Sequence, residues 1–137
     1  MNKWKWVLVT LFFAIPAFLT GKMIWPPNHE MMPTATQLPF FIILSAVESL
    51  MFGLGVSFLL FGYSLVKKSS KTSRKSTFLV YLSIAWILIS WWSHDNTHAS
   101  NGMNLQGLLY IEYGYHLTLM IAGVILAHSF FKNSKRA

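Results

Sequence analysis

Four long apolar runs, nearly free of charged side chains, constrain this 137-residue chain more than any other feature. They cover approximately residues 4–21, 38–66, 77–98 and 107–131. A helix needs about 20 residues to cross the roughly 30 Å hydrocarbon core of a bilayer, and each run is near or above that length. The runs are continuous rather than alternating, which excludes the strands of a membrane β-barrel. We therefore predict a single all-α domain, an integral membrane four-helix bundle.

Composition supports this class and excludes others. Hydrophobic residues make up 54% of the chain and charged residues only 11%, whereas soluble domains usually carry about 25% charged residues. The high apolar fraction excludes a disordered chain. The absence of cysteine excludes a disulfide scaffold, a cysteine-ligated zinc site and covalent c-type haem.

The positive charges indicate how the chain is oriented. Ten of the eleven Lys and Arg residues would share one side of the membrane, and only Lys22 falls in a predicted loop on the other side. The ten are Lys3, Lys5, Lys67, Lys68, Lys71, Arg74, Lys75, Lys132, Lys135 and Arg136. The positive-inside rule then predicts a multi-pass protein of the cell membrane with both termini in the cytoplasm. Topology and anionic lipid heads explain the basic balance, so we expect no nucleic-acid partner.

The first apolar run resembles a signal peptide, because it follows the basic start Met1-Asn-Lys-Trp-Lys. No clean small-x-small cleavage site comes after it, so we expect a retained membrane anchor. Pro16 is expected to kink this helix, because proline removes a backbone donor and clashes with the preceding turn.

Small residues recur every fourth position in the second run, at Ser45, Ser49, Gly53 and Ser57. Such residues let another backbone approach closely in lipid. The approaching helix belongs either to this bundle or to a second copy in a homodimer. Aromatic residues near the outer ends of two other runs fit an interfacial belt: Trp91, Trp92, Tyr110 and Tyr113.

All four acids and four of the five histidines fall in the outer half of the predicted topology. Three helices place an ionisable side chain about 28–30 Å along the helix from an inner cation: Glu48 counted from Lys67, His94 from Lys75 and Glu112 from Lys132. His116 lies about one turn deeper than Glu112. The remaining histidine, His128, lies toward the inner end, where we expect a packing or interfacial role.

Spacing places these groups on shared helix faces. Glu112 and His116 are four residues apart, and so are His94 and His98 if the third helix continues that far. Ionisable groups inside a membrane pair, line a cavity or bind something. Imidazole and carboxylate groups suit divalent Zn, Fe, Mn or Cu. We therefore predict a metal site formed by Glu48, His94, Glu112 and His116, with Asp95, His98, His29 and Glu30 as supporting hydrogen-bond partners or a second metal position.

The sequence leaves open which group occupies this cluster. Haem b between His94 and His116 ranks behind a non-haem ion, because the surround is rich in carboxylates. Thioethers near the outer loops, from Met23, Met31, Met32 and Met103, would suit copper(I). The cluster could also be a metal-free hydrogen-bonded network that is structural or lines a proton or substrate cavity.

Three functions follow from these readings. The first is a metal-binding membrane protein with an outward-facing site and a redox, metalloenzyme or metal-handling role, in which Glu48 or Glu112 could serve as a general base. The second is a dimeric, ion-coupled small transporter that uses Glu48. In size and helix number the chain resembles the small multidrug-resistance exporters, but their acid lies on the first span, so no residue is carried over. The third is a non-catalytic accessory subunit of a larger membrane complex.

Overall fold

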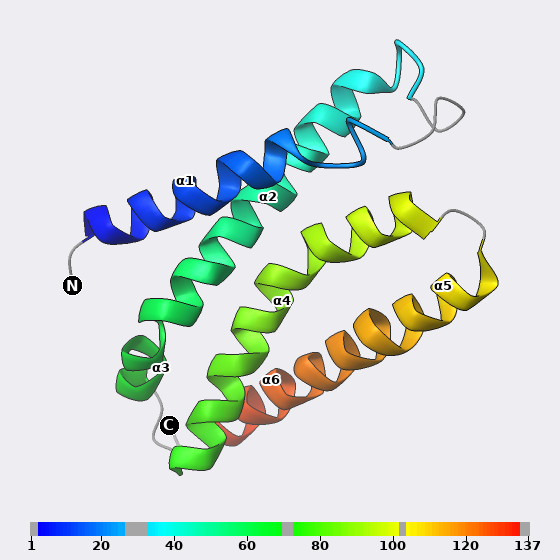
Figure 1. Cartoon of the computed structure of the whole chain (residues 1–137). Coiled ribbons are helices and arrows are strands. Elements are labelled where there is room, and N and C mark those ends of the chain that lie inside the picture. The colour runs from blue at the N-terminus through cyan, green and yellow to red at the C-terminus, as the bar shows by residue number, and fades with distance from the viewer. Residues whose placement is uncertain (1–2, 27–32, 70–72, 102–103, 135–137) are drawn as a thin grey trace.

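The computed structural model describes residues 3–26, 33–69, 73–101 and 104–134, and every regular element within these ranges is a helix (Figure 1). The elements are α1 (Lys3–Leu19), α2 (Leu38–Phe61), α3 (Tyr63–Ser69), α4 (Arg74–Asn101), α5 (Leu105–Ile111), the π-helical segment η2 (Glu112–Leu117) and α6 (Thr118–Ser134). The segments α5, η2 and α6 follow one another without a break and form one long rod. The prediction of an all-α fold is confirmed for these residues.

Three helical stretches are long and apolar enough to cross a membrane: Leu38–Phe61, Arg74–Asn101 and Leu105–Asn133. The first helix, α1, has 17 residues, or about 25 Å, which is shorter than the roughly 30 Å core. Pro16 lies inside α1, and the helix continues past it to Leu19. The second predicted run, 38–66, is divided at Gly62, where α2 ends and α3 begins.

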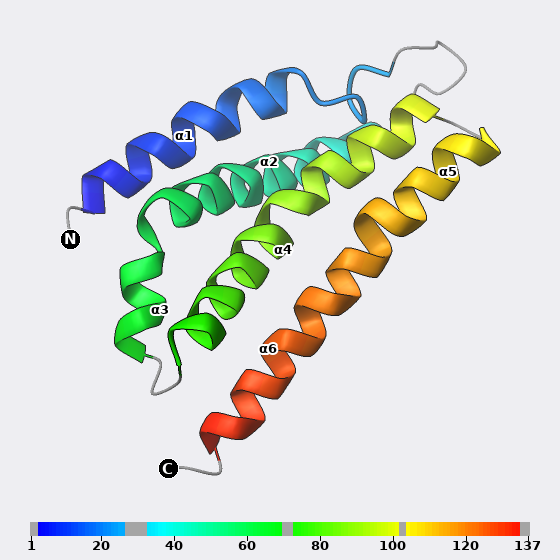
Figure 2. The ribbon, with the colours of Figure 1, turned by 60° about the horizontal axis from the view of Figure 1, so that its bottom comes forward.

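Helix α2 lies between α1 and α4, and two glycines permit the close contacts. A Cβ atom at Gly53 would lie 2.2 Å from the Thr10 carbonyl oxygen on α1. A Cβ atom at Gly55 would lie 2.7 Å from the Ile89 side chain on α4. Since α4 packs in turn on α6, the helices form a row in the order α1, α2, α4 and α6 (Figure 2). Among the described residues, no comparably extensive contact joins α1 to α6, and a closed four-helix bundle stays a prediction.

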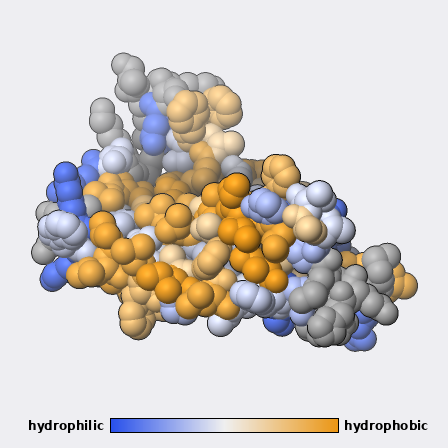
Figure 3. Space-filling model, turned by 90° about the horizontal axis from the view of Figure 1, so that it is seen from above, coloured by the Kyte–Doolittle hydropathy of each residue, from blue (hydrophilic) through white to orange (hydrophobic). Residues whose placement is uncertain are grey.

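Polar and apolar side chains are distributed in the opposite way to a water-soluble protein. The largest fully buried side chains are one isoleucine and four serines: Ile111, Ser45, Ser49, Ser57 and Ser90. Large apolar side chains face outward, for example Phe12 at 72% and Val124 at 68% exposure. Figure 3 shows one such face, on which apolar residues predominate. Soluble proteins rarely expose so much contiguous apolar surface, whereas helices in lipid do.

The small-residue face of α2 is used inside the chain. Its four residues are buried, and the Ser57 hydroxyl lies 2.9 Å from the Thr10 hydroxyl of α1. The prediction of packing within the chain is therefore confirmed, and α1 covers this face.

The aromatic belt is found only in part. Trp91, Tyr110 and Tyr113 are exposed, as a belt requires. Trp92 instead donates its indole N–H to the Ala17 carbonyl oxygen at 3.1 Å and packs its ring against Phe52. The belt assignment of Trp92 is therefore wrong, because its ring and its donor are both used to join α4 to α1 and α2.

Candidate functional site

Helix α4 provides the first half of the site, because it continues without a break through His98 to Asn101. His94 and His98 therefore lie one turn apart on the same face, and their ring centroids are 4.6 Å apart. His94 is buried, as are Ser83 and Ser90, which precede it on this face. The face directs the two imidazoles toward the neighbouring rod of α5, η2 and α6.

The π-helical segment η2 provides the second half. Its wider turn, with i→i+5 hydrogen bonds, lets the consecutive residues Tyr115 and His116 both contact α4. The Tyr115 ring stacks on Trp86 with centroids 6.2 Å apart. The Trp86 indole N–H donates to the Thr118 hydroxyl at 2.9 Å. These contacts fix the height at which His116 meets His94.

A continuous chain of polar contacts connects four of the side chains. The His94 Nδ1 atom lies 2.6 Å from Asp95 Oδ1, and the His116 Nδ1 atom lies 2.8 Å from Glu112 Oε2. The two Nε2 atoms, of His94 and His116, face each other at 2.8 Å. The series of contacts thus runs Asp95–His94–His116–Glu112, with two residues from α4 and two from η2.

The chemistry of these contacts makes the facing nitrogens unusual. An ionised carboxylate only accepts hydrogen bonds, so each histidine satisfies its carboxylate by donating from Nδ1. A neutral imidazole with a proton on Nδ1 carries a lone pair on Nε2. Two lone pairs 2.8 Å apart repel each other unless a cation lies between them. With both carboxylates ionised, the arrangement of His94 and His116 favours a proton or a metal ion shared between the two Nε2 atoms.

A third imidazole points to the same place. Each of His94, His98 and His116 offers one ring nitrogen, and these three atoms lie within 4.8 Å of one another. Zinc–nitrogen bonds of about 2.0–2.1 Å in a tetrahedron put two ligand nitrogens roughly 3.3 Å apart. The His94 and His116 nitrogens would have to separate by about half an ångström to reach that spacing.

Glu48 joins the cluster from α2, behind Asp95. It is buried, at 5% exposure, and its carboxyl group interacts with that of Asp95. Its Oε2 atom has no hydrogen-bond partner among the described residues. Solvent exposure of the side chains rises along the series of polar contacts, from the buried His94 to Glu112 at 62%.

All six residues predicted from the sequence are thus brought together, namely Glu48, His94, Asp95, His98, Glu112 and His116. Their arrangement differs from the prediction in one respect. His98 converges with the other two imidazoles, whereas Glu112 contacts the far nitrogen of His116. Sequence spacing did not indicate this, because it does not say which side of a ring a carboxylate meets.

A cavity of about 310 Å³ adjoins the cluster and is lined in part by Lys22, Met23, Phe41, Asp95 and His98. The segment after α1 is held there, because the Lys22 backbone N–H donates to Asn96 Oδ1 at 2.6 Å. The cavity gives an ion or small molecule a route to the His98 imidazole. Met23 is the only predicted thioether in the described ranges; Met31, Met32 and Met103, together with His29 and Glu30, lie outside them.

Comparison with models of protein families, with curated proteins and with solved structures found no match for this chain. No residue role is therefore transferred from another protein. The functional assignment depends on the three converging imidazoles and on the carboxylates that orient two of them.

Proposed function

We propose that this chain is a multi-pass membrane protein that binds a divalent transition-metal ion through the imidazole nitrogens of His94, His98 and His116. The facing Nε2 atoms of His94 and His116, 2.8 Å apart, carry the proposal. A shared proton would satisfy only these two nitrogens. A metal ion would satisfy them and also use the third nitrogen, from His98.

The carboxylates support the same assignment. Histidines that bind metals usually donate the other ring N–H to a carboxylate, which fixes the ring and raises its basicity. Both His94 and His116 have this partner, in Asp95 and Glu112 respectively. Glu48 and Glu112, predicted from the sequence as ligands, become supporting groups in this proposal.

Three nitrogen ligands leave a coordination position for water or substrate. Such a site suits redox, hydrolytic or metal-handling chemistry with Zn, Fe, Mn or Cu. Haem b fits less well between His94 and His116, because two axial nitrogens on opposite sides of a haem iron stand about 4 Å apart and the macrocycle fills the space between the rings.

We also propose that the site faces the outside of the cell membrane and that both termini are cytoplasmic. The beginning of α1, the helix α3, the beginning of α4 and the end of α6 lie toward the left of Figure 2, and all carry lysine or arginine. The imidazole cluster lies in the other half of α4. The positive-inside rule assigns the basic end to the cytoplasm.

Metal analysis of the purified, detergent-solubilised chain tests the site. After chelation and reloading with Zn²⁺ or Cu²⁺, we expect about one bound ion per chain in the wild type. His98→Ala and His116→Ala should each weaken binding by at least about tenfold, because each removes a nitrogen ligand. His128→Ala is the matched control, since its side chain is exposed on α6, away from the cluster. A wild type that binds no ion, or equal losses in all three variants, would exclude the proposal.

The buried Glu48 favours a second candidate, the dimeric ion-coupled transporter. Its Oε2 atom has no hydrogen-bond partner among the described residues, and buried acids of this kind mark ion pathways in membranes. In that case Glu48→Gln should abolish substrate-driven proton release while the metal content stays unchanged. If the chain is instead an accessory subunit of a larger complex, the wild type should bind no ion.

A further inference from the structure

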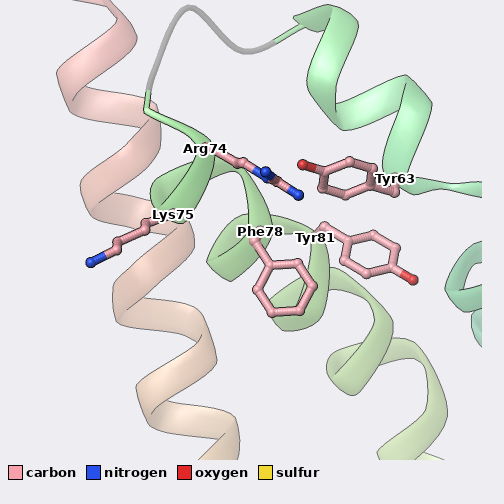
Figure 4. A pocket seen from close by; sticks show the side chains of 5 residues that line it. All are labelled: Tyr63, Arg74, Lys75, Phe78 and Tyr81. Carbon is pink, nitrogen blue, oxygen red and sulfur yellow. The ribbon is translucent and has the colours of Figure 1, made fainter.

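A second cavity lies at the opposite end of the molecule from the histidines. It has a volume of about 700 Å³ and is lined by Tyr63 of α3 and by Arg74, Lys75, Phe78 and Tyr81 of α4 (Figure 4). None of these five residues takes part in the proposed metal site.

The break between α2 and α3 forms one wall of the cavity. At Gly62 a Cβ atom would lie 2.6 Å from the Phe58 ring, so the close turn there excludes a side chain. The turn directs α3 alongside the beginning of α4, where Tyr63 meets the α4 rings. The centroid of Tyr63 is 5.5 Å from that of Tyr81 and 6.4 Å from that of Phe78. The Tyr81 hydroxyl donates to the Leu59 carbonyl oxygen, which fixes this aromatic wall.

The mouth of the cavity is positively charged. Arg74 and Lys75 are exposed, and Figure 4 shows the guanidinium of Arg74 directed toward the Tyr63 hydroxyl while Lys75 extends to the other side. The two ion pairs found among the described residues both involve histidines of the other cluster. Neither cation at the mouth therefore has a carboxylate partner in the described part of the chain.

We propose that this cavity binds the headgroup of an anionic phospholipid. Arg74 would hold the phosphate, because its planar guanidinium matches phosphate oxygens with two parallel hydrogen bonds. The Tyr63 hydroxyl would add a donor. The rings of Phe78 and Tyr81 would contact the glycerol and the first acyl methylenes, since aromatic rings favour the level where one end is apolar and the other is wet.

The level of the cavity along the helices supports a lipid as the occupant. It lies where α2 ends, at Phe61, and α4 begins, at Arg74. Both are ends of helices long and apolar enough to span a membrane, so the cavity lies at the headgroup level if they do. The inference rests on the membrane placement of the chain and not on the metal site, so the two proposals fail independently.

The experiment measures lipid binding to the full, metal-free chain in neutral detergent micelles. Spin-labelled phosphatidylglycerol is the probe, with spin-labelled phosphatidylcholine and inorganic phosphate as comparison ligands. We expect the wild type to bind phosphatidylglycerol at least about tenfold more tightly than phosphatidylcholine, a difference of about 1.4 kcal/mol. Arg74→Gln should remove most of this preference, and Arg74→Lys should restore part of it.

Lys132→Gln is the matched control, because it removes an exposed cation at the same end that does not line the cavity. It should leave the preference unchanged. The thermal midpoint of each variant verifies that it is folded. Equal binding of the two lipids by the wild type would overturn the proposal, and so would an equal loss in Arg74→Gln and Lys132→Gln. Displacement of the labelled lipid by millimolar inorganic phosphate would show a free-anion site instead.

Discussion

At the scale of single residues, the carboxylates decide what the histidines can do. Asp95 and Glu112 each hold the Nδ1 atom of one imidazole, and this leaves both Nε2 atoms to face the same point. The histidines alone would be free to flip or to adopt the other tautomer. The site is therefore a property of two His–carboxylate pairs and not of the imidazoles by themselves.

The Glu112→Gln substitution tests this dependence. Glutamine keeps the size of the side chain and an oxygen that can accept from His116 Nδ1, but it removes the charge, so the His116 imidazole loses basicity. We expect metal affinity to fall by about 10–100-fold, as is typical when such a supporting group is lost. The measurement is calorimetric titration of the chelator-stripped protein with Zn²⁺.

Glu48→Gln is the comparison for this substitution, because Glu48 interacts with Asp95 and not with an imidazole. It should lower the affinity less than Glu112→Gln does. If the two substitutions have the same effect, the contact of Glu112 with His116 has no specific role in metal binding.

Counting along the helices was sufficient to predict which residues meet, because i and i+4 positions share a face and because Glu48, His94 and Glu112 lie at similar distances from the basic ends of their helices. It was not sufficient to predict their roles. Whether the Glu112 carboxylate meets the Nδ1 or the Nε2 atom of His116 depends on rotamers that sequence does not fix. The same limit applies to Trp92, whose partner Ala17 is on another helix.

At the scale of helices, the α1–α2 contact depends on the absence of side-chain atoms. A Cβ atom at Gly53 would lie 2.2 Å from a backbone oxygen, which has little room to move. We expect Gly53→Ala to destabilise the protein by about 1–3 kcal/mol, the usual cost of overpacking. Thermal unfolding in detergent, followed by tryptophan fluorescence, measures the change.

Gly123→Ala is the matched control, because no atom lies within 4 Å of a Cβ atom built at that position of α6. It should leave the thermal midpoint unchanged or raise it slightly, since alanine favours a helix over glycine. A lower midpoint in Gly123→Ala than in Gly53→Ala would contradict the role assigned to the α1–α2 contact.

The segment η2 makes a separate prediction, because its extra residue sets the register between α5 and α6. Deletion of Gly114 should restore regular α-helix. The contacts of Trp86 with Tyr115 and Thr118 would hold α6 in place, and without the wider turn His116 would no longer contact α4 together with Tyr115, so it would move away from His94. We expect the fold to persist and metal affinity to fall about as far as in Glu112→Gln. Circular dichroism and Zn²⁺ titration measure the two quantities.

Gly114→Ala keeps the chain length and is the control for the deletion, since a Cβ atom there meets nothing within 4 Å. It should bind Zn²⁺ as the wild type does. Undiminished binding in the deletion variant would show that the π-helical register is irrelevant to the site.

Hydropathy predicted the helical runs because each is set by some 20 residues at once, so that single positions matter little. The π-helical turn of η2 is instead a local change of register, and the break at Gly62 lies at a single glycine. A single glycine is compatible with an uninterrupted helix, with a turn or with a bulge, and local packing selects among them. These features were therefore not predicted, although the π-helix positions His116.

At the scale of the whole molecule, acidic and basic side chains are separated along the helix axes. Among the described residues, the carboxylates and three of the four histidines lie toward one end of the helices, whereas the lysines and arginines other than Lys22 lie toward the other end. Orientation in the membrane therefore decides which side each proposed site faces, although neither binding proposal depends on it. An outward-facing cluster could exchange metal with the surroundings, and an inward-facing basic cavity would meet the anionic lipids that are enriched in the cytoplasmic leaflet.

Cysteine labelling measures this orientation directly, because the chain has no cysteine of its own. Single variants Lys67→Cys and Lys132→Cys mark the basic end, and Leu105→Cys marks the other end; all three positions are exposed. With a membrane-impermeant maleimide on intact cells, we expect only Leu105→Cys to react, because the positive-inside rule keeps the cations in the cytoplasm. The other two should react after permeabilisation. If Lys67→Cys and Lys132→Cys are labelled on opposite sides, then α4 and α6 do not both cross the membrane. If both are labelled from outside, the histidine cluster faces the cytoplasm.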